Sequence, residues 1–306
     1  MHLYVVILAI VQGLAELLPV SSSAHVIVAA KLLGIDPSDP ATTLLIVMLH
    51  TGTMFAVIAY FWQRWRTNLF PSWAVFTAKA GRLVVATLCT AVVGMPLVFV
   101  IPRVALGLGL LGVDADGHIR KAEVESLFGN LALMGVSLAV VGVLILIAGL
   151  RERRLNAAGP AVPASTPGAQ GEGELSWFAA EVIGAVQGLC LPFRGFSRSG
   201  ATISTAMLLD VAKQRAEEFS FALAVIITPA VVAREVGRVL HAHAAGTVHL
   251  GHLAGDCLLG MVVSFLAGLA ALRWLSRWLD GGLWYLFGIY CLVAAGVVLA
   301  LHHAGF

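Results

Sequence analysis

Long uninterrupted apolar runs dominate this chain and predict membrane-spanning helices. An α-helix rises 1.5 Å per residue, so about 20 apolar residues cross the ~30 Å hydrocarbon core of a bilayer. The runs are continuous and do not alternate with polar residues at a period of two, which disfavours a β-barrel. We therefore predict about six transmembrane helices, over residues 43–62, 83–101, 127–149, 219–240, 250–272 and 284–301.

Four other apolar segments are too short, or too interrupted by polar residues, to be expected to span alone. They cover residues 3–18, 20–34, 178–190 and 199–211. Such segments commonly re-enter the membrane or lie against other helices. The pattern as a whole predicts an all-α polytopic membrane protein in which these segments re-enter the membrane or lie against other helices.

Composition agrees with this class and excludes others. Of the 306 residues, 59% are hydrophobic and only 12% are charged, about half the charged share of an ordinary soluble domain. A net charge of +2 provides no strongly basic surface for nucleic acid, so no nucleic-acid partner is expected. The four cysteines contain no CxxC pair and are expected to act as small apolar side chains.

The chain contains an internal repeat. Val-Gln-Gly-Leu occurs at 11–14 and again at 186–189, and each copy precedes a Leu-Pro pair, a Ser-rich turn and three predicted spans. An odd number of spans per copy predicts an inverted repeat within one integral membrane domain, with halves of about 1–150 and 177–306. The Ala-, Gly- and Pro-rich segment within 151–176 indicates a flexible cytoplasmic linker. Inverted repeats with interrupted helices place a site where the repeats meet.

Basic residues orient the predicted spans. They gather between the first two spans, after the third, and between the fifth and sixth. The positive-inside rule places these segments in the cytoplasm, and both termini then face outward.

The first polar motif lies within an apolar segment. Gln12 and Glu16 are four residues apart, so a helix presents both on one face. A charged side chain in the membrane costs roughly 2.5–3.5 kcal/mol on insertion scales and commonly faces a partner, an ion or water. One carboxylate, an amide oxygen and phosphate oxygens would suit Mg²⁺, although a carboxylate hydrogen-bonded inside the bundle is the simpler alternative.

A helix break follows this motif. Pro19 interrupts the helix, and the hydroxyls of Ser21 and Ser22 could cap the next one or, with its first N–H groups, bind an anion. His25 lies three residues beyond Ser22, close enough on one helical face to act with it. Capping alone would also explain the serines.

The second motif supplies positive charge. Arg194 and Arg198 are four residues apart, with Ser197, Ser199 and Thr202 around them. A guanidinium holds phosphate oxygens bidentately and keeps its charge, although an arginine can also reach from a helix to lipid headgroups. A cation ligand, nucleophile candidates and a phosphate clamp are the parts of a phosphoryl-transfer site, so the two motifs predict one composite phosphate site.

The two motifs resemble those of a known protein family. The segment QGLAELLPVSSSAH at 12–25 resembles the (E/Q)xxxE and PVSS…H motifs of the bacterial undecaprenyl-pyrophosphate phosphatases of the BacA type. The segment GFSRSGAT at 195–202 resembles their PGxSRSxxT motif, with Arg194 in place of the proline. The similarity covers nearly the whole chain.

The resemblance implies an enzyme that removes the terminal phosphate of the C55 isoprenyl pyrophosphate. That reaction regenerates the lipid carrier for peptidoglycan synthesis and is associated with bacitracin resistance. The resemblance further implies a divalent cation (Mg²⁺ or Ca²⁺), a multi-pass position in the bacterial inner membrane, and a site that opens to the periplasm. Polyprenyl pyrophosphate and membrane lipids are the expected partners, and association into a homo-oligomer is left open.

The resemblance also assigns roles to residues of this sequence. Glu16, with Gln12, would assist metal or pyrophosphate binding. Ser22 would be the nucleophile, with His25 as its base or as an alternative nucleophile beside water. By this resemblance the phosphates would be held by Ser197, Arg198 and Thr202. The chemistry of the residues themselves adds Ser21, Arg194 and Ser199 to the predicted phosphate-binding set.

A second class of function would use the same side chains to bind a phosphate without hydrolysing it. A transporter or flippase of a phosphorylated polyprenyl lipid would have an inverted repeat and the same Arg and Ser side chains. It would not need Ser22 and His25 beside a carboxylate, so hydrolysis is the favoured prediction. A structural scaffold would leave Glu16 and Arg198 unexplained.

Overall fold

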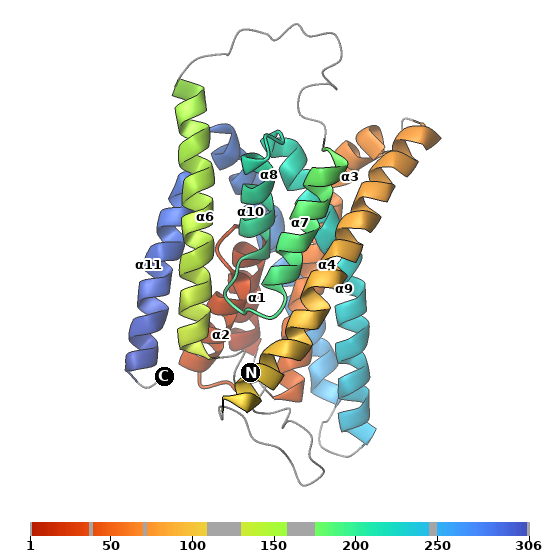
Figure 1. The fold of residues 1–306 in the computed structure, drawn as a ribbon. Helices are drawn as coiled ribbons and strands as arrows, with labels where there is room; N and C mark the ends of the chain where they lie inside the picture. The colour runs from red at the N-terminus through yellow and green to blue at the C-terminus, as the bar shows by residue number, and fades with distance from the viewer. Residues whose placement is uncertain are drawn as a thin grey trace, which may run out of the picture. The chain divides into compact units, whose positions relative to one another are not determined.

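All regular secondary structure in the described residues is helical. The computed structural model describes residues 2–36, 39–69, 72–108, 130–157, 175–244 and 250–304 (Figure 1). Its helices are α1 (His2–Leu17), α2 (Ser22–Leu32), α3 (Pro40–Leu69), α4 (Trp73–Gly107), α6 (Leu131–Ala157), α7 (Trp177–Cys190), α8 (Arg198–Leu208), α9 (Lys213–Ala244), α10 (Leu250–Asp280) and α11 (Trp284–His303).

Five of the described helices are long and apolar enough to cross a membrane. They comprise Ala41–Asn68, Trp73–Gly107, Leu131–Ala157, Leu253–Trp278 and Trp284–His303. These helices confirm five of the predicted spans and make the chain a multi-pass membrane protein. The remaining predicted span, 219–240, falls on α9, several of whose side chains lie outside the described residues.

Most of the long helices extend beyond the apolar runs that predicted them. Backbone hydrogen bonding continues through good helix formers after the apolar stretch ends, because each added residue contributes a bond once the helix is nucleated. Helix α6 therefore continues to Ala157, so the first seven residues of the predicted linker 151–176 are helical. Residues 158–174 of that linker lie outside the described residues.

The four short apolar segments form two pairs of helices, each with a break in the middle. Helix α1 is followed by α2 after a four-residue connection, and α7 is followed by α8 after seven residues, 191–197. These bounds agree closely with the predicted segments. That either pair re-enters the membrane stays a prediction.

The described chain divides into two compact units. One unit comprises Met1–Thr77 and Glu218–Asp280, and the other comprises Ala78–Glu217 and Gly281–Phe306. Each unit therefore contains segments from both halves of the sequence.

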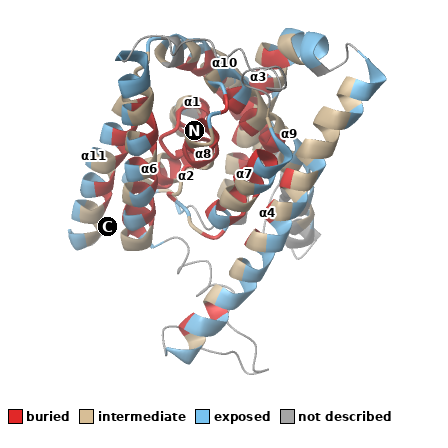
Figure 2. Ribbon diagram, turned by 45° about the horizontal axis from the view of Figure 1, so that its top comes forward, coloured by how far each residue is buried: buried red, intermediate tan, exposed pale blue. Residues whose placement is uncertain are grey.

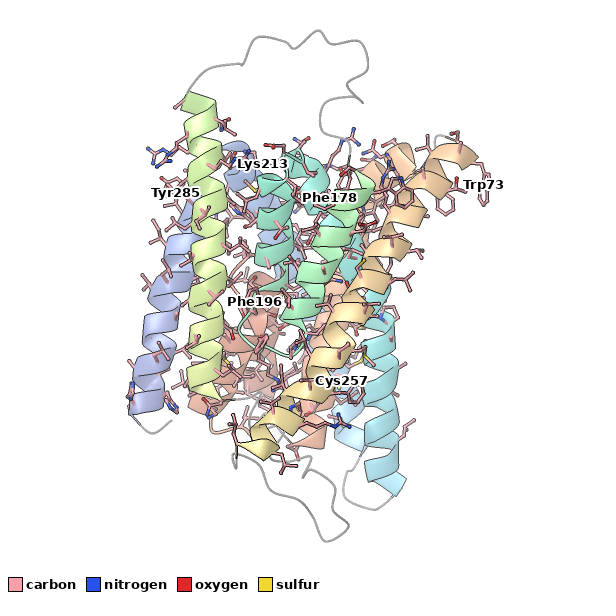
Figure 3. All side chains as sticks on the ribbon, in the orientation of Figure 1. Trp73, Phe178, Phe196, Lys213, Cys257 and Tyr285 are labelled. Atoms are coloured by element: carbon pink, nitrogen blue, oxygen red, sulfur yellow. The ribbon has the colours of Figure 1, made fainter. Side chains whose placement is uncertain are left out.

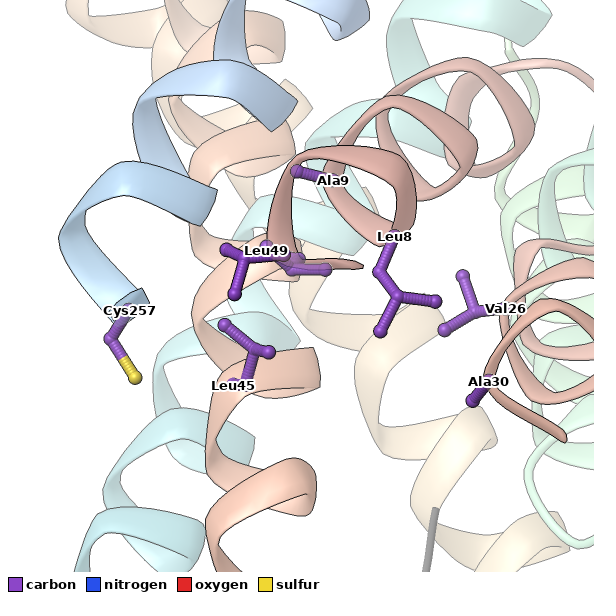
Figure 4. Close-up of a cluster of buried hydrophobic side chains, with 8 residues drawn as sticks. Leu8, Ala9, Val26, Ala30, Leu45, Leu49 and Cys257 are labelled. Carbon is purple, nitrogen blue, oxygen red and sulfur yellow. The ribbon is translucent and has the colours of Figure 1, made fainter. Parts of the chain in front are cut away.

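In the first unit, α1 packs among α2, α3 and α10. Their contact contains a cluster of buried apolar side chains (Figure 4): Val5, Leu8, Ala9, Val26, Ala30, Leu45, Leu49 and Cys257. Burial of this kind positions the carboxyl end of α1, which carries the first polar motif.

In the second unit, α6 and α11 lie side by side (Figure 1). Small residues make the close approach possible: a Cβ atom added at Gly142 would lie 3.0 Å from the Cβ of Cys291, and one added at Gly135 would lie 2.7 Å from Leu299. Membrane helices commonly associate through such small residues, because lipid provides no hydrophobic driving force between helices.

Two glycines of the repeated tetrapeptide make matching contacts, each within its own unit. A Cβ atom added at Gly13 of α1 would lie 2.7 Å from the carbonyl oxygen of Ser264 on α10. One added at Gly188 of α7 would lie 2.8 Å from the carbonyl oxygen of Thr90 on α4. Gly188 follows Gly13 by 175 residues, and Ser264 follows Thr90 by 174. The glycine of the repeated tetrapeptide thus makes a comparable close contact with a helix backbone in each unit.

Helix α4 is exposed along much of its length (Figure 2), and many of its exposed residues are apolar. Val84, Leu88 and Val92 recur at helical spacing and are more than half exposed. An apolar helix face of this size in a polytopic protein suits contact with lipid chains.

Candidate active site

The break between α1 and α2 is built around Pro19 and Ser21. Helix α1 ends at Leu17 and Pro19 follows, where the missing N–H of proline prevents an ordinary helical continuation. Ser21 then adopts φ 67°, a left-handed conformation that non-glycine residues rarely occupy. Strain of this kind costs about 1–3 kcal/mol and gathers at functional sites.

The carboxylate of Glu16 is the centre of the first site. Its Oε2 atom accepts hydrogen bonds from the Gln12 amide at 3.0 Å and from the Ser22 hydroxyl. The Glu16 side chain is only 13% exposed, so these contacts replace water that the carboxylate has lost. Gln12, Glu16 and Ser22, three residues predicted from the sequence, are thus brought into direct contact.

His50 is a member of this cluster that the sequence reasoning missed. It lies on α3, and its Nε2 atom is 3.3 Å from Oε2 of Glu16. Its Nδ1 atom is 2.8 Å from the carbonyl oxygen of Ile46, which can only accept a hydrogen bond. An ionisable side chain inside an apolar span indicates function by default, and that signal was present in the predicted span 43–62.

The ring of His25 contacts the backbone of the first break. Its Nδ1 atom lies 2.7 Å from the carbonyl oxygen of Ser21, which ties the first turn of α2 to the strained residue. The Ser22 hydroxyl is directed instead to Glu16. The Ser21 hydroxyl lies 3.4 Å from that of Ser23 and makes no cap to α2 among the described contacts.

The amide of Gln12 presents an oxygen that the described residues do not satisfy. Gln12 is fully buried, and its Oε1 atom has no hydrogen-bond partner in the described part of the chain. An unsatisfied buried acceptor costs about 1–3 kcal/mol, so it calls for a partner such as a cation or water. The described residues contain no group of three or more His, Cys, Asp or Glu side chains that could form a metal site by themselves.

The second motif lies at the break between α7 and α8, where Figure 3 marks Phe196. Gly195 has φ 98°, and a Cβ atom there would lie 2.8 Å from the Met134 side chain, so glycine is required for both reasons. Ser197 caps α8 by accepting a hydrogen bond from the N–H of Gly200 at 3.2 Å.

Arg198 is the first residue of α8 and is half-buried, whereas Arg194 lies exposed in the turn before it. Ser199 and Thr202 are buried in the same helix. The Thr202 hydroxyl donates to the carbonyl oxygen of Arg198 at 2.8 Å. The second motif thus places a cation beside hydroxyls that are already held by the backbone.

Other side chains in this unit fix the position of α8. The indole N–H of Trp284 donates to the Ser204 hydroxyl at 3.0 Å. At the far end of the helix, Arg151 donates to the carbonyl oxygen of Leu208 at 2.9 Å and pairs with Asp210, also at 2.9 Å. A cation at the carboxyl end of a helix is favourable because the last carbonyls lack helical partners.

The chain matches a protein-family model over residues 5–297, and that family is described as bacitracin resistance protein BacA. The chain belongs to the BacA family. A BacA-family relative from Acinetobacter baylyi, named undecaprenyl-diphosphatase 2, is 52% identical over 98% of this chain and 97% of its own length. An undecaprenyl-diphosphatase from Desulfosudis oleivorans is 33% identical over 96% of both chains. A third, from Rhodopirellula baltica, is 28% identical over 97% of both.

Proposed function

We propose that this chain is an undecaprenyl-diphosphate phosphatase that hydrolyses the terminal phosphate of the C55 isoprenyl pyrophosphate and regenerates the lipid carrier for peptidoglycan synthesis. Membership of the BacA family and the names of its relatives support this assignment. The observation that carries it is the hydrogen bond from the Ser22 hydroxyl to the Glu16 carboxylate. A nucleophilic hydroxyl needs an adjacent base, and the Glu16 carboxylate is placed to serve as that base for Ser22.

The reaction begins with proton transfer from Ser22 to Glu16. The Ser22 oxygen then attacks the terminal phosphorus, and the bond between that phosphorus and the bridging oxygen breaks. Undecaprenyl phosphate leaves with the proton that Glu16 had taken up. Glu16 then accepts a proton from the water that attacks the phosphoserine and returns it to the Ser22 oxygen, which gives free phosphate and the starting hydroxyl. Developing charge on the phosphate oxygens needs positive partners, a role suited to Arg198 with Ser197, Ser199 and Thr202. The sequence motifs assign Ser21 and Arg194 to phosphate binding as well.

A divalent cation, Mg²⁺ or Ca²⁺, completes the proposed site. The residues fit such an ion, because Gln12 has a buried oxygen without a hydrogen-bond partner beside the Glu16 carboxylate. These two side chains would hold the ion and phosphate oxygens would fill further positions, as Mg²⁺ prefers. When bound, the ion supplies charge neutralisation on the pyrophosphate.

Hydrolysis is favoured over transport of the same lipid. A flippase would use the arginines to bind phosphate, but it has no need for a serine hydroxyl directed at a buried carboxylate. The comparable contacts of Gly13 and Gly188 agree with a repeat, and the resemblance to the family adds that it is inverted, with two re-entrant helix pairs. The proposal includes a position in the bacterial inner membrane with the site open to the periplasm.

A phosphate-release assay tests the function. The purified chain in detergent, supplied with undecaprenyl or farnesyl pyrophosphate and Mg²⁺ or Ca²⁺, is expected to release inorganic phosphate, and EDTA is expected to stop the release. The Arg198→Ala variant, which lacks the guanidinium, serves as the inactive control. Absence of phosphate release under every divalent cation would contradict the proposal.

A further inference from the structure

His50 approaches Glu16 from a third element of the first unit. Gln12 reaches the carboxylate from α1, Ser22 from the start of α2, and His50 from α3. All three contacts converge on Oε2 of Glu16. The orientation of this carboxylate is therefore set by the packing of three separate elements.

The ring of His50 is itself held in place. Its Nδ1–H donates to the carbonyl oxygen of Ile46 one turn earlier on α3, so the opposite nitrogen, Nε2, faces Glu16 and donates to the carboxylate when the ring carries both protons. Helix α3 at this level is fixed by α10, because the Ser264 hydroxyl donates to the carbonyl oxygen of Leu49 at 2.8 Å. The contact of His50 with Glu16 is thus supported by hydrogen bonds within α3 and between α3 and α10.

We infer that His50 is a positioning residue for phosphoryl transfer, which holds the Glu16 carboxylate in the orientation that receives the Ser22 proton. This inference rests on the proposed function. A carboxyl group can rotate about its last side-chain bond, and a base that is misplaced by about 1 Å can lose on the order of a hundredfold in rate. Three contacts on one oxygen restrict that rotation.

Substitution of His50 by glutamine or by asparagine distinguishes the contact made by Nε2 from the contact made by Nδ1. A glutamine amide nitrogen reaches the position of Nε2, whereas an asparagine amide nitrogen reaches only that of Nδ1. His50→Gln therefore keeps the contact to Glu16, and His50→Asn keeps only the contact to Ile46. Both variants are polar amides, so they form a matched pair in the same apolar helix.

The experiment measures kcat, KM and the thermal unfolding midpoint of the purified variants in detergent with undecaprenyl pyrophosphate. We expect His50→Asn to lower kcat about tenfold or more, and His50→Gln to stay within about threefold of the unsubstituted chain. KM and the unfolding midpoint should change little in either. Tyr60→Phe is the control. It removes the 2.8 Å contact between the hydroxyls of Tyr60, also on α3, and Ser276, and it should leave kcat unchanged.

Equal kcat values for the asparagine and glutamine variants would overturn the inference, as would a loss matched by a fall in the unfolding midpoint. The unsubstituted chain would still release phosphate in that case, and the proposed function would be unaffected. If the unsubstituted chain releases no phosphate, the proposed function itself fails, so the two failures are distinguishable.

Discussion

At the scale of single residues, the chemistry of this protein depends on how Glu16 is solvated inside an apolar segment. A carboxylate there costs several kcal/mol unless polar groups replace water. The hydroxyl of Ser22 is one of those groups, and it is also the group that a phosphoryl transfer needs as nucleophile. Stabilisation of the buried charge and activation of the serine are thus served by the same hydrogen bond.

Removal of the Ser22 hydroxyl tests this pairing. Ser22→Ala is expected to lower the rate of phosphate release by about a hundredfold or more, because nucleophile and base act as a unit. The neighbouring substitution Ser23→Ala is the matched control and should stay within about threefold, since the Ser23 hydroxyl lies 3.4 Å from that of Ser21. Should Ser22→Ala keep most of the activity, water or His25 is the nucleophile.

At the scale of elements, the two helix breaks are built differently. Helix α8 is capped by the Ser197 side chain and follows a seven-residue connection that requires Gly195. Helix α2 follows a four-residue connection in which Ser21 is strained and caps nothing among the described residues. The first break therefore directs the Ser22 hydroxyl to a carboxylate, whereas the second uses Ser197 to cap the helix that begins at Arg198.

Close packing of α6 against α11 keeps the second unit together, and a substitution can test it. Gly142→Leu is expected to cost about 1–3 kcal/mol through overpacking, because its Cβ would meet Cys291 and the carbonyl oxygen of Gly288. The measurement is the thermal unfolding midpoint in detergent. Gly296→Leu on α11 is the control, since a Cβ there meets nothing within 4 Å. Equal midpoints for the two variants would show that this contact does not limit stability.

At the scale of the whole molecule, the chain interleaves its two sequence halves. The unit that contains α1, α2 and α3 takes α10 from the second half, and the unit that contains α7 and α8 takes α4 and α6 from the first. Neither half of the chain therefore contains a complete unit. We expect separately expressed halves to be less stable than the whole chain for this reason.

Orientation in the membrane is also a whole-molecule property, and the basic residues predict it. The connection between α3 and α4 should be cytoplasmic and the carboxyl terminus should face outward. In intact cells, a membrane-impermeant maleimide is expected to label Ala304→Cys and to spare Ser72→Cys. The unsubstituted chain controls for its own cysteines, of which three are buried and Cys89 is half-buried. The reverse labelling pattern would invert the topology.

The sequence by itself determined the class of protein and the positions of its helices. Apolarity is a local property, so runs of apolar residues predicted α3 and α11, and Pro19 predicted the break after α1. Motif spacing likewise identified Gln12 and Glu16 as neighbours, because four residues make about one helical turn.

Only the tertiary structure decided which polar groups meet at Glu16. Ser22 is six residues from Glu16, a spacing that does not share a face on a continuous helix; the two meet because the chain turns back at the break. His50 is 34 residues away and joins them because α3 packs against α1. Contacts of this kind depend on the packing of separate helices, which periodicity along one segment does not specify.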